Sequence, residues 1–173
     1  PVDQRMITCG MGSELVIWNA NTGEQLLVLN ERAGGVMSCR FSADGQFVLA
    51  GYADSLARIW DSHSGRLVTT LAGHSRRIRD VRFNPDQTPR LTWGMDDRAI
   101  IWDIAEPFAN QLLVLDGNSQ LLQAHWTPDG RDIVSAWSDG HLKIWRGSTK
   151  EDIAMLKAGE DDFETMFRAW QMQ

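Results

Sequence analysis

The 173 residues contain few of the features that mark secreted or membrane proteins. Two cysteines, Cys9 and Cys39, cannot build a disulfide framework, and no Asn-x-Ser/Thr sequon occurs. The chain also contains neither a signal peptide nor an apolar run near the ~18 residues that a membrane helix needs. We therefore expect a cytoplasmic protein without contact to a membrane. Because the chain begins at Pro1, an earlier targeting segment remains an open alternative.

Patterns that would indicate catalysis or nucleic-acid binding are also missing from the sequence. The 17 basic residues are outnumbered by 23 acidic ones, and a net charge of −6 argues against nucleic acid as the main partner. The histidines show no metal-ligand spacing, and Gly10-Met11-Gly12-Ser13 lacks the lysine and the helix of a phosphate-binding loop. We expect no cofactor, no metal and no enzymatic activity.

What the sequence does contain is a repeat. Four tryptophans recur at intervals of 42, 42 and 43 residues, and each ends a short apolar strand. A second aromatic precedes three of them by 19 residues, and a turn aspartate lies six residues before the same three. Each unit therefore predicts four short strands joined by tight turns, copied in tandem. The tryptophans are Trp18, Trp60, Trp102 and Trp145; the aromatics are Phe41, Phe83 and Trp126; the aspartates are Asp54, Asp96 and Asp139.

This pattern resembles the WD40 repeat over roughly residues 1–157, with Trp60-Asp61, Trp102-Asp103 and Gly73-His74 as local motifs. The resemblance implies an all-β fold of about four blades of a β-propeller, each a four-stranded antiparallel sheet. The units are 31–72, 73–116 and 117–157, preceded by a partial unit at 1–30. Closed rings of this family usually need about seven blades, so the ring is expected to be incomplete.

The first unit starts in its second strand, because Arg5–Cys9 aligns with second strands elsewhere in the repeat. We therefore expect further blades, either from the same parent chain or from a second copy. The segment 158–173 departs from the repeat. Phe163, Met166, Phe167 and Trp170 have the spacing of one helical face, which favours an amphipathic helix. An inner strand that closes the ring remains the alternative.

The resemblance also implies a hydrogen-bonded quartet, which is complete in one unit as His74, Thr92, Asp96 and Trp102. The other units depart from it. Gly117 replaces the histidine in the last unit, which keeps Ser135, Asp139 and Trp145. Arg32 and Ala50 replace the histidine and the hydroxyl in the second unit. The first unit keeps Thr8 and Trp18, with Gly12 in place of the aspartate.

Candidate binding residues lie in the loops and turns that the family places on the top face. Arg76 and Arg77 belong to the densest basic stretch, 75–82. This stretch either anchors an acidic or phosphorylated peptide or, as we favour, forms a solvated loop with ion pairs between blades. Arg32 and Asn118 lie in the corresponding loops of other units.

Tyr52, Met95 and Trp137 are further candidates, near the ends of second strands where Gly10 and Gly94 show that small residues occur. As exposed side chains they would act as anchors for a partner. Packing between blades is the other interpretation, and it is slightly favoured for the neighbouring Trp93.

The main functional hypothesis is a non-catalytic scaffold that binds a protein or peptide through the top-face loops. The alternative is a ligand-sensing regulatory domain of a larger signalling protein, an NTPase or a kinase, whose catalytic part lies outside this chain. An enzyme with its site in the central channel is the third hypothesis, but no residues suited to such chemistry are placed there.

Overall fold

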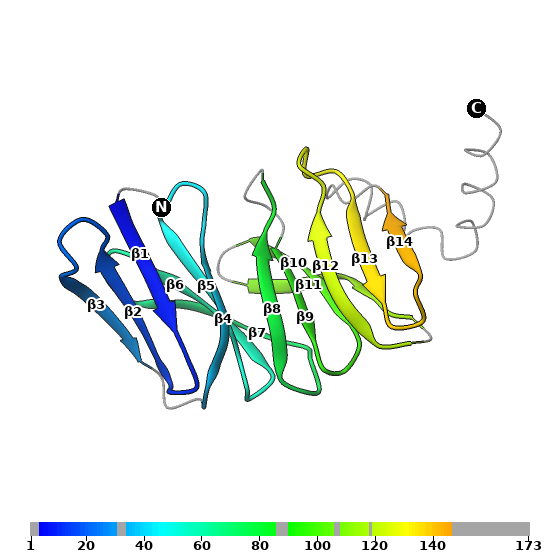
Figure 1. Cartoon of the computed structure of the whole chain (residues 1–173), viewed down its shortest axis with the longest axis horizontal. Helices are drawn as coiled ribbons and strands as arrows, with labels where there is room; N and C mark the ends of the chain where they lie inside the picture. The colour runs from blue at the N-terminus through cyan, green and yellow to red at the C-terminus, as the bar shows by residue number, and fades with distance from the viewer. Residues whose placement is uncertain (1–3, 31–33, 86–89, 106–107, 118, 147–173) are drawn as a thin grey trace.

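The computed structural model describes residues 4–30, 34–85, 90–105, 108–117 and 119–146. Within these residues the chain folds into fourteen strands, which form four antiparallel sheets. The sheets stand side by side in chain order (Figure 1). The all-β fold with four blade-like sheets is therefore confirmed. No helix in the described part of the chain is long and apolar enough to cross a bilayer.

In each sheet the strands pair with their neighbours in the sequence. The first sheet contains β1 (Arg5–Cys9), β2 (Glu14–Asn19) and β3 (Gln25–Asn30). The second contains β4 (Val36–Phe41), β5 (Phe47–Tyr52), β6 (Leu56–Asp61) and β7 (Leu67–Ala72). The third contains β8 (Ile78–Phe83), β9 (Arg90–Gly94), β10 (Ala99–Ala105) and β11 (Phe108–Leu115). The fourth contains β12 (Leu121–Trp126), β13 (Ile133–Trp137) and β14 (Leu142–Trp145).

The first sheet begins with the second strand of the repeat. Thr8 of β1 pairs with Val16, just as Thr92 of β9 pairs with Ile100 in the four-stranded third sheet. The alignment of Arg5–Cys9 with second strands is thus confirmed. The predicted end of the last unit and the segment 158–173 lie outside the described residues.

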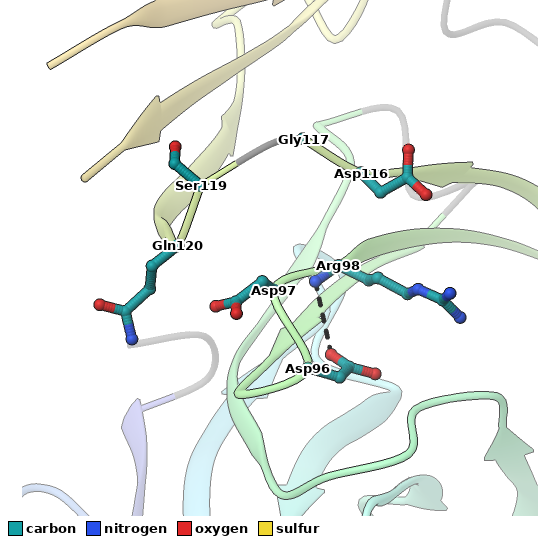
Figure 2. Close-up of a pocket in the computed structure, with 7 residues that line it drawn as sticks. All are labelled: Asp96, Asp97, Arg98, Asp116, Gly117, Ser119 and Gln120. Carbon is teal, nitrogen blue, oxygen red and sulfur yellow. Dashed lines mark hydrogen bonds between the residues drawn. The ribbon is translucent and has the colours of Figure 1, made fainter. Parts of the chain in front are cut away.

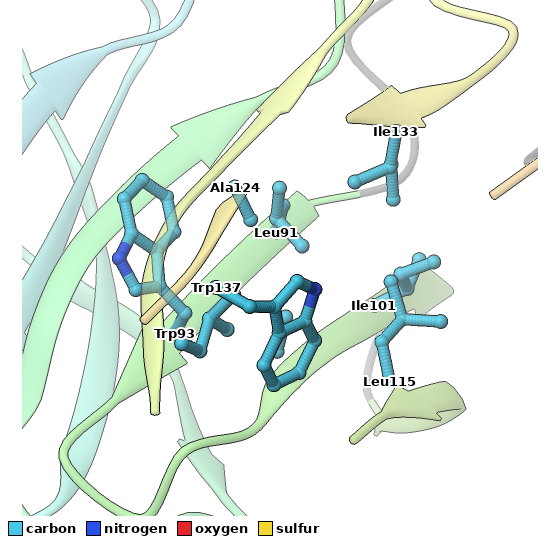
Figure 3. Close-up of a cluster of buried hydrophobic side chains, with 9 residues drawn as sticks. Leu91, Trp93, Ile101, Leu115, Ala124, Ile133 and Trp137 are labelled. Atoms are coloured by element: carbon cyan, nitrogen blue, oxygen red, sulfur yellow. The ribbon is translucent and has the colours of Figure 1, made fainter. Parts of the chain in front are cut away.

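The apolar core lies between the sheets. Side chains alternate along a strand, so Ile59 of β6 packs toward the third sheet while the adjacent Trp60 packs toward the first. Figure 3 shows the buried cluster between the third and fourth sheets, which includes Leu91, Ile101 and Ile133. Each of the two inner sheets thus depends on two neighbours for the burial of its faces.

The recurring aspartates shape the turn between the second and third strands in three of the four units. The Oδ1 atoms of Asp54, Asp96 and Asp139 accept hydrogen bonds from the backbone N–H two residues later, at 3.1, 3.4 and 3.0 Å. The intervening residues Ser55, Asp97 and Gly140 have φ values of 73°, 61° and 86°. A short polar side chain before a left-handed residue is what such a turn needs. The aspartates therefore have a structural role here.

The two ends of the array expose apolar side chains that the inner sheets bury. Ile144 directly precedes Trp145 and is 57% exposed, whereas Ile59 directly precedes Trp60 and is 1% exposed. In the first sheet Met6 pairs with Trp18 and is 49% exposed, whereas Val48 pairs with Trp60 and is fully buried. The outer faces of the first and fourth sheets thus match faces that neighbouring sheets cover inside the array.

This difference predicts unequal costs for the same substitution. Ile59→Ala should lower the free energy of unfolding by about 2–5 kcal/mol, because it leaves a cavity between two sheets. Ile144→Ala, at the matching position of the last sheet, should cost less than about 1 kcal/mol. Urea unfolding of both variants measures the difference. Equal losses would show that the outer face of β14 is covered in solution.

Candidate partner-binding rim

Along one edge of the stacked sheets, where second strands end and third strands begin, a loop-and-turn unit repeats from sheet to sheet. We call this edge the rim. It comprises the turns 52–55, 94–97 and 137–140 and the described parts of the loops that lead into β4, β8 and β12. The same backbone hydrogen bond joins turn to loop in three sheets: Ala53 to Gly35, Met95 to Arg77 and Ser138 to Gln120, at 2.9, 2.9 and 2.8 Å. The sheets therefore present three equivalent, tightly held loop-and-turn pairs.

Below the rim of the third sheet, the four residues predicted as a quartet form a continuous hydrogen-bond chain. His74 Nδ1 lies 2.9 Å from Asp96 Oδ1, and His74 Nε2 lies 2.8 Å from Thr92 Oγ1. Trp102 Nε1 donates to the same Thr92 oxygen at 2.9 Å. The chain is satisfied if Nδ1 carries the proton and the Thr92 hydroxyl donates to Nε2.

Burial keeps this imidazole neutral. Loss of hydration lowers the pKa of His74 below its ordinary value of 6.5, and this effect outweighs the opposing influence of the Asp96 carboxylate. Asp96 also accepts a hydrogen bond from the backbone N–H of Ser75, at 3.0 Å. The quartet thus ties the tryptophan of the blade to the loop at the rim.

Trp137 of the fourth sheet fills the space that the missing histidine leaves. Its Nε1 donates to Ser135 Oγ at 2.9 Å, and Trp145 donates to the same oxygen at 2.7 Å. A Cβ on Gly117 would lie 2.5 Å from the Trp137 ring, whereas a Cβ on Gly94 would lie 2.9 Å from His74 Nδ1. The third sheet therefore has histidine at the first of these positions and glycine at the second, whereas the fourth sheet has glycine at the first and tryptophan at the second. Trp137 is a buried packing residue, so its interpretation as an exposed anchor is wrong.

Tyr52 of the second sheet has the same register as Gly94 and Trp137, and it is also fully buried. The Arg58 guanidinium lies over its ring, 4.5 Å from the centroid, and binds the Asp54 carboxylate at 2.8 Å. Ala50 supplies no hydroxyl, and Trp60 Nε1 has no hydrogen-bond partner among the described residues. Tyr52 is therefore not an exposed anchor either, because a cation–π contact and packing replace the quartet here.

The first sheet keeps one bond of the quartet, between Trp18 Nε1 and Thr8 Oγ1 at 2.8 Å. The neighbouring candidate Trp93 is buried between the third and fourth sheets, as the packing interpretation favoured.

Among the surface candidates, Arg76 and Arg77 are exposed on the rim and Met95 is half-buried beside them. Arg76 Nη1 donates to the carbonyl oxygen of Met95 at 3.3 Å. Arg32 and Asn118 lie outside the described residues.

At the strand end of the basic stretch, Arg82 binds Asp80 at 2.8 Å, and Arg40 of the second sheet approaches the same carboxylate at 3.6 Å. Of these two contacts, only that between Arg40 and Asp80 joins two blades, so the ion pairs between blades that we favoured are present in part.

The rim also contains a feature that the sequence did not indicate. An open, polar hollow of about 420 Å³ lies between the third and fourth sheets (Figure 2). Asp97 and Arg98 approach it from the turn after β9, and Asp116 and Gln120 from the loop before β12. Asp97 and Arg98 are far from Asp116 within one unit and Gln120 belongs to the next, so no local motif points to them.

The comparisons with known proteins agree with this geometry. The family model described as WD domain, G-beta repeat matches residues 23–61, 65–103 and 109–146, which is more than half of the chain. The chain belongs to the WD40-repeat family. Each matched segment begins near the outer strand of one sheet and ends near the repeat tryptophan of the next, so the WD40 repeat and the blade are offset by one strand.

Three relatives illustrate the range of the similarity. The chain is 27% identical over 156 residues to the serine-threonine kinase receptor-associated protein of Gallus gallus, covering 90% of this chain and 44% of that protein. It is 25% identical over 178 residues to Protein HIR1 of Mycosarcoma maydis, with coverages of 86% and 17%. It is 23% identical over 141 residues to Autophagy-related protein 16 of Arabidopsis thaliana, with coverages of 81% and 27%. The chain spans less than half the length of these relatives.

The quartet geometry predicts the effect of removing one hydroxyl. Thr92→Val should lower the free energy of unfolding by about 1–3 kcal/mol, because it leaves His74 and Trp102 without their shared partner. Thr70→Val, on an exposed position of β7, is the matched control and should change stability by less than about 0.5 kcal/mol. Chemical unfolding of both variants tests this, and a Thr92→Val variant as stable as the control would contradict it.

A second prediction concerns pH. Because the folded-state pKa of His74 is below 6.5, the unfolded chain binds this proton more readily. The contribution of His74 to stability is therefore complete above about pH 6.5 and is lost as the pH falls toward the folded-state pKa. The slope should reach at most about 1.4 kcal/mol per pH unit.

Unfolding free energies measured between about pH 7.5 and 5.5 provide the test. His74→Gln should flatten the slope in this window. His125→Gln is the control: burial and the nearby Arg82 also lower the pKa of His125, but its side chain is exposed, so a smaller change is expected. An unchanged slope in His74→Gln would refute the assignment.

Proposed function

We propose that this WD40 protein is a non-catalytic scaffold that binds a protein or peptide through its rim. Members of the family are typically protein-interaction scaffolds and are usually non-catalytic. The observation that carries the proposal is the repeated backbone hydrogen bond between turn and loop, which holds three equivalent loop-and-turn pairs along the rim. Such preorganisation lowers the entropy that a binding surface loses when a partner docks.

The side chains on this surface define the partner chemistry. Arg76 and Arg77 are exposed beside the turn of the third sheet, and Asp97 and Arg98 of this turn line the hollow together with Asp116. A partner segment that carries both acidic and basic groups is complementary to this arrangement. The buried Tyr52 and Trp137 support the rim from below and make no contact with the partner.

The exposed end faces support a second kind of partner. Further blades, from the same parent chain or from a second copy, would cover Ile144 and Met6 as the inner sheets cover Ile59 and Val48.

A regulatory domain within a larger protein remains the second candidate function. It is favoured by the similarity to the DENN domain and WD repeat-containing protein SCD1 of Arabidopsis thaliana, of which the chain covers 12% at 23% identity. A cytoplasmic location remains a prediction from composition.

Random peptides displayed on phage and selected for binding to this protein test the rim. The affinity of the selected peptides should fall at least about tenfold in the double variant Arg76→Ala with Arg77→Ala, or in Asp97→Asn, because these side chains lie on the proposed surface. Asparagine tolerates the left-handed φ of residue 97, so this variant should fold.

Arg66→Ala is the matched control, since Arg66 is exposed at the opposite end of the second sheet. Peptides that lose affinity for this variant, and retain it for the rim variants, would refute the rim as the binding surface.

A further inference from the structure

The two cysteines, far apart in the sequence, meet at the interface between the first and second sheets. Cys39 of β4 is buried in the core cluster that joins these sheets, and Cys9 of β1 packs against this cluster while remaining partly exposed. Both are free thiols. The strands are also joined directly after Cys9, where the backbone N–H of Val36 donates to the carbonyl oxygen of Gly10 at 2.9 Å.

The repeat shows that the two cysteines occupy a fixed contact position between blades. Cys39 pairs within its sheet with Ala50, as Val81 pairs with Thr92 in the next sheet. Cys9 corresponds in the same way to Gly51, since each directly follows the position of the quartet hydroxyl.

At this equivalent contact, a Cβ on Gly51 would lie 3.0 Å from Cγ1 of Val81. A Cβ at the first of these positions therefore lies in direct reach of the side chain at the second, across the interface. A disulfide needs such neighbouring side chains, with Cβ atoms about 3.5–4.5 Å apart. The third interface holds Trp93 and Ala124 at these positions, so reactive side chains face each other only between the first and second sheets of the described structure.

We propose that Cys9 and Cys39 form a peroxide-sensitive dithiol, a modification site that reversibly cross-links the first two blades. The partly exposed Cys9 is the attacking sulfur and the buried Cys39 is the resolving thiol.

The local chemistry supports these two roles. A hydrogen bond from the Cys39 thiol and the charge of Arg40 lower the pKa of Cys9 to about 7, against the opposing effects of burial and Asp80. The same hydrogen bond, together with burial, raises the pKa of Cys39. A large fraction of Cys9 is thus thiolate at neutral pH, while Cys39 keeps its proton. A partly exposed thiolate beside a second thiol is the arrangement typical of redox-sensitive cysteines.

The reaction proceeds in two balanced steps with hydrogen peroxide as the oxidant. The Cys9 thiolate attacks one peroxide oxygen, the O–O bond breaks, and the products are a sulfenic acid and hydroxide. The Cys39 thiol then loses its proton to that hydroxide, and its sulfur attacks the Cys9 sulfur. The hydroxyl group of the Cys9 sulfenic acid leaves as hydroxide, which a proton from solvent converts to water. The product is a Cys9–Cys39 disulfide, which a thiol reductant returns to the dithiol.

The experiment treats the folded 173-residue chain with hydrogen peroxide at neutral pH, blocks the remaining thiols with N-ethylmaleimide, and measures the intact mass. The expected product is monomeric, has lost about 2 Da and carries no maleimide. Trypsin without reduction should yield the peptides Met6–Arg32 and Ala33–Arg40 joined to each other. Dithiothreitol should separate them.

Two variants separate the roles. Cys39→Ala uses the residue that the fourth sheet has at this position, Ala124, and should leave Cys9 to gain about 32 Da as sulfinic acid. If this variant fails to fold, Cys39→Val uses the residue of the third sheet, Val81. Cys9→Ser should leave Cys39 largely unoxidised. A chain that takes up oxygen without losing two hydrogens, forms disulfide-linked dimers or does not react with peroxide would overturn the proposal.

Discussion

The structure depends on the burial of both faces of every blade. Neighbouring residues of a strand point to opposite sides of the sheet, so Ile59 and Trp60 need two different partners. A sheet of three or four short strands cannot cover either face with its own chain. Stacking in chain order satisfies both, and it leaves the two outermost faces exposed. The rim, the hollow and the cysteine pair all result from this stacking, because each combines residues of different sheets or equivalent positions in successive ones.

Much of the fold could be predicted because its determinants are local and repeated. The tryptophan period gives the number of units, and the turn aspartates mark where the second strand ends in three of them. That Arg5–Cys9 forms the second strand of its unit followed from the sequence alignment alone. The quartet of the third unit could be named from the resemblance, because each of its members has a fixed place in the repeat.

The positions of Tyr52 and Trp137 could not be predicted in this way. Whether a large side chain at this register is exposed depends on a residue of another strand. His74 occupies the space beside Gly94, whereas Gly117 leaves that space to Trp137. The sequence contains this relation only as a reciprocal exchange between two units, and each residue viewed alone fits a surface anchor equally well. The contact between Cys9 and Cys39 and the hollow beside Asp97 and Asp116 were not anticipated for the same reason.

The exchange has a consequence for the rim. In the third sheet Asp96 is held by His74 and in turn holds the backbone N–H of Ser75; its side chain is only 4% exposed. In the fourth sheet Trp137 fills the same space but extends no hydrogen bond to the turn aspartate, and the Asp139 side chain is 40% exposed. The two walls of the hollow therefore differ: a buried hydrogen bond between His74 and Asp96 anchors one, and the other depends more on the Ser138–Gln120 backbone bond. Because buried polar contacts resist local opening more than exposed ones, we expect the described part of the loop before β12 to open more readily than the turn of the third sheet.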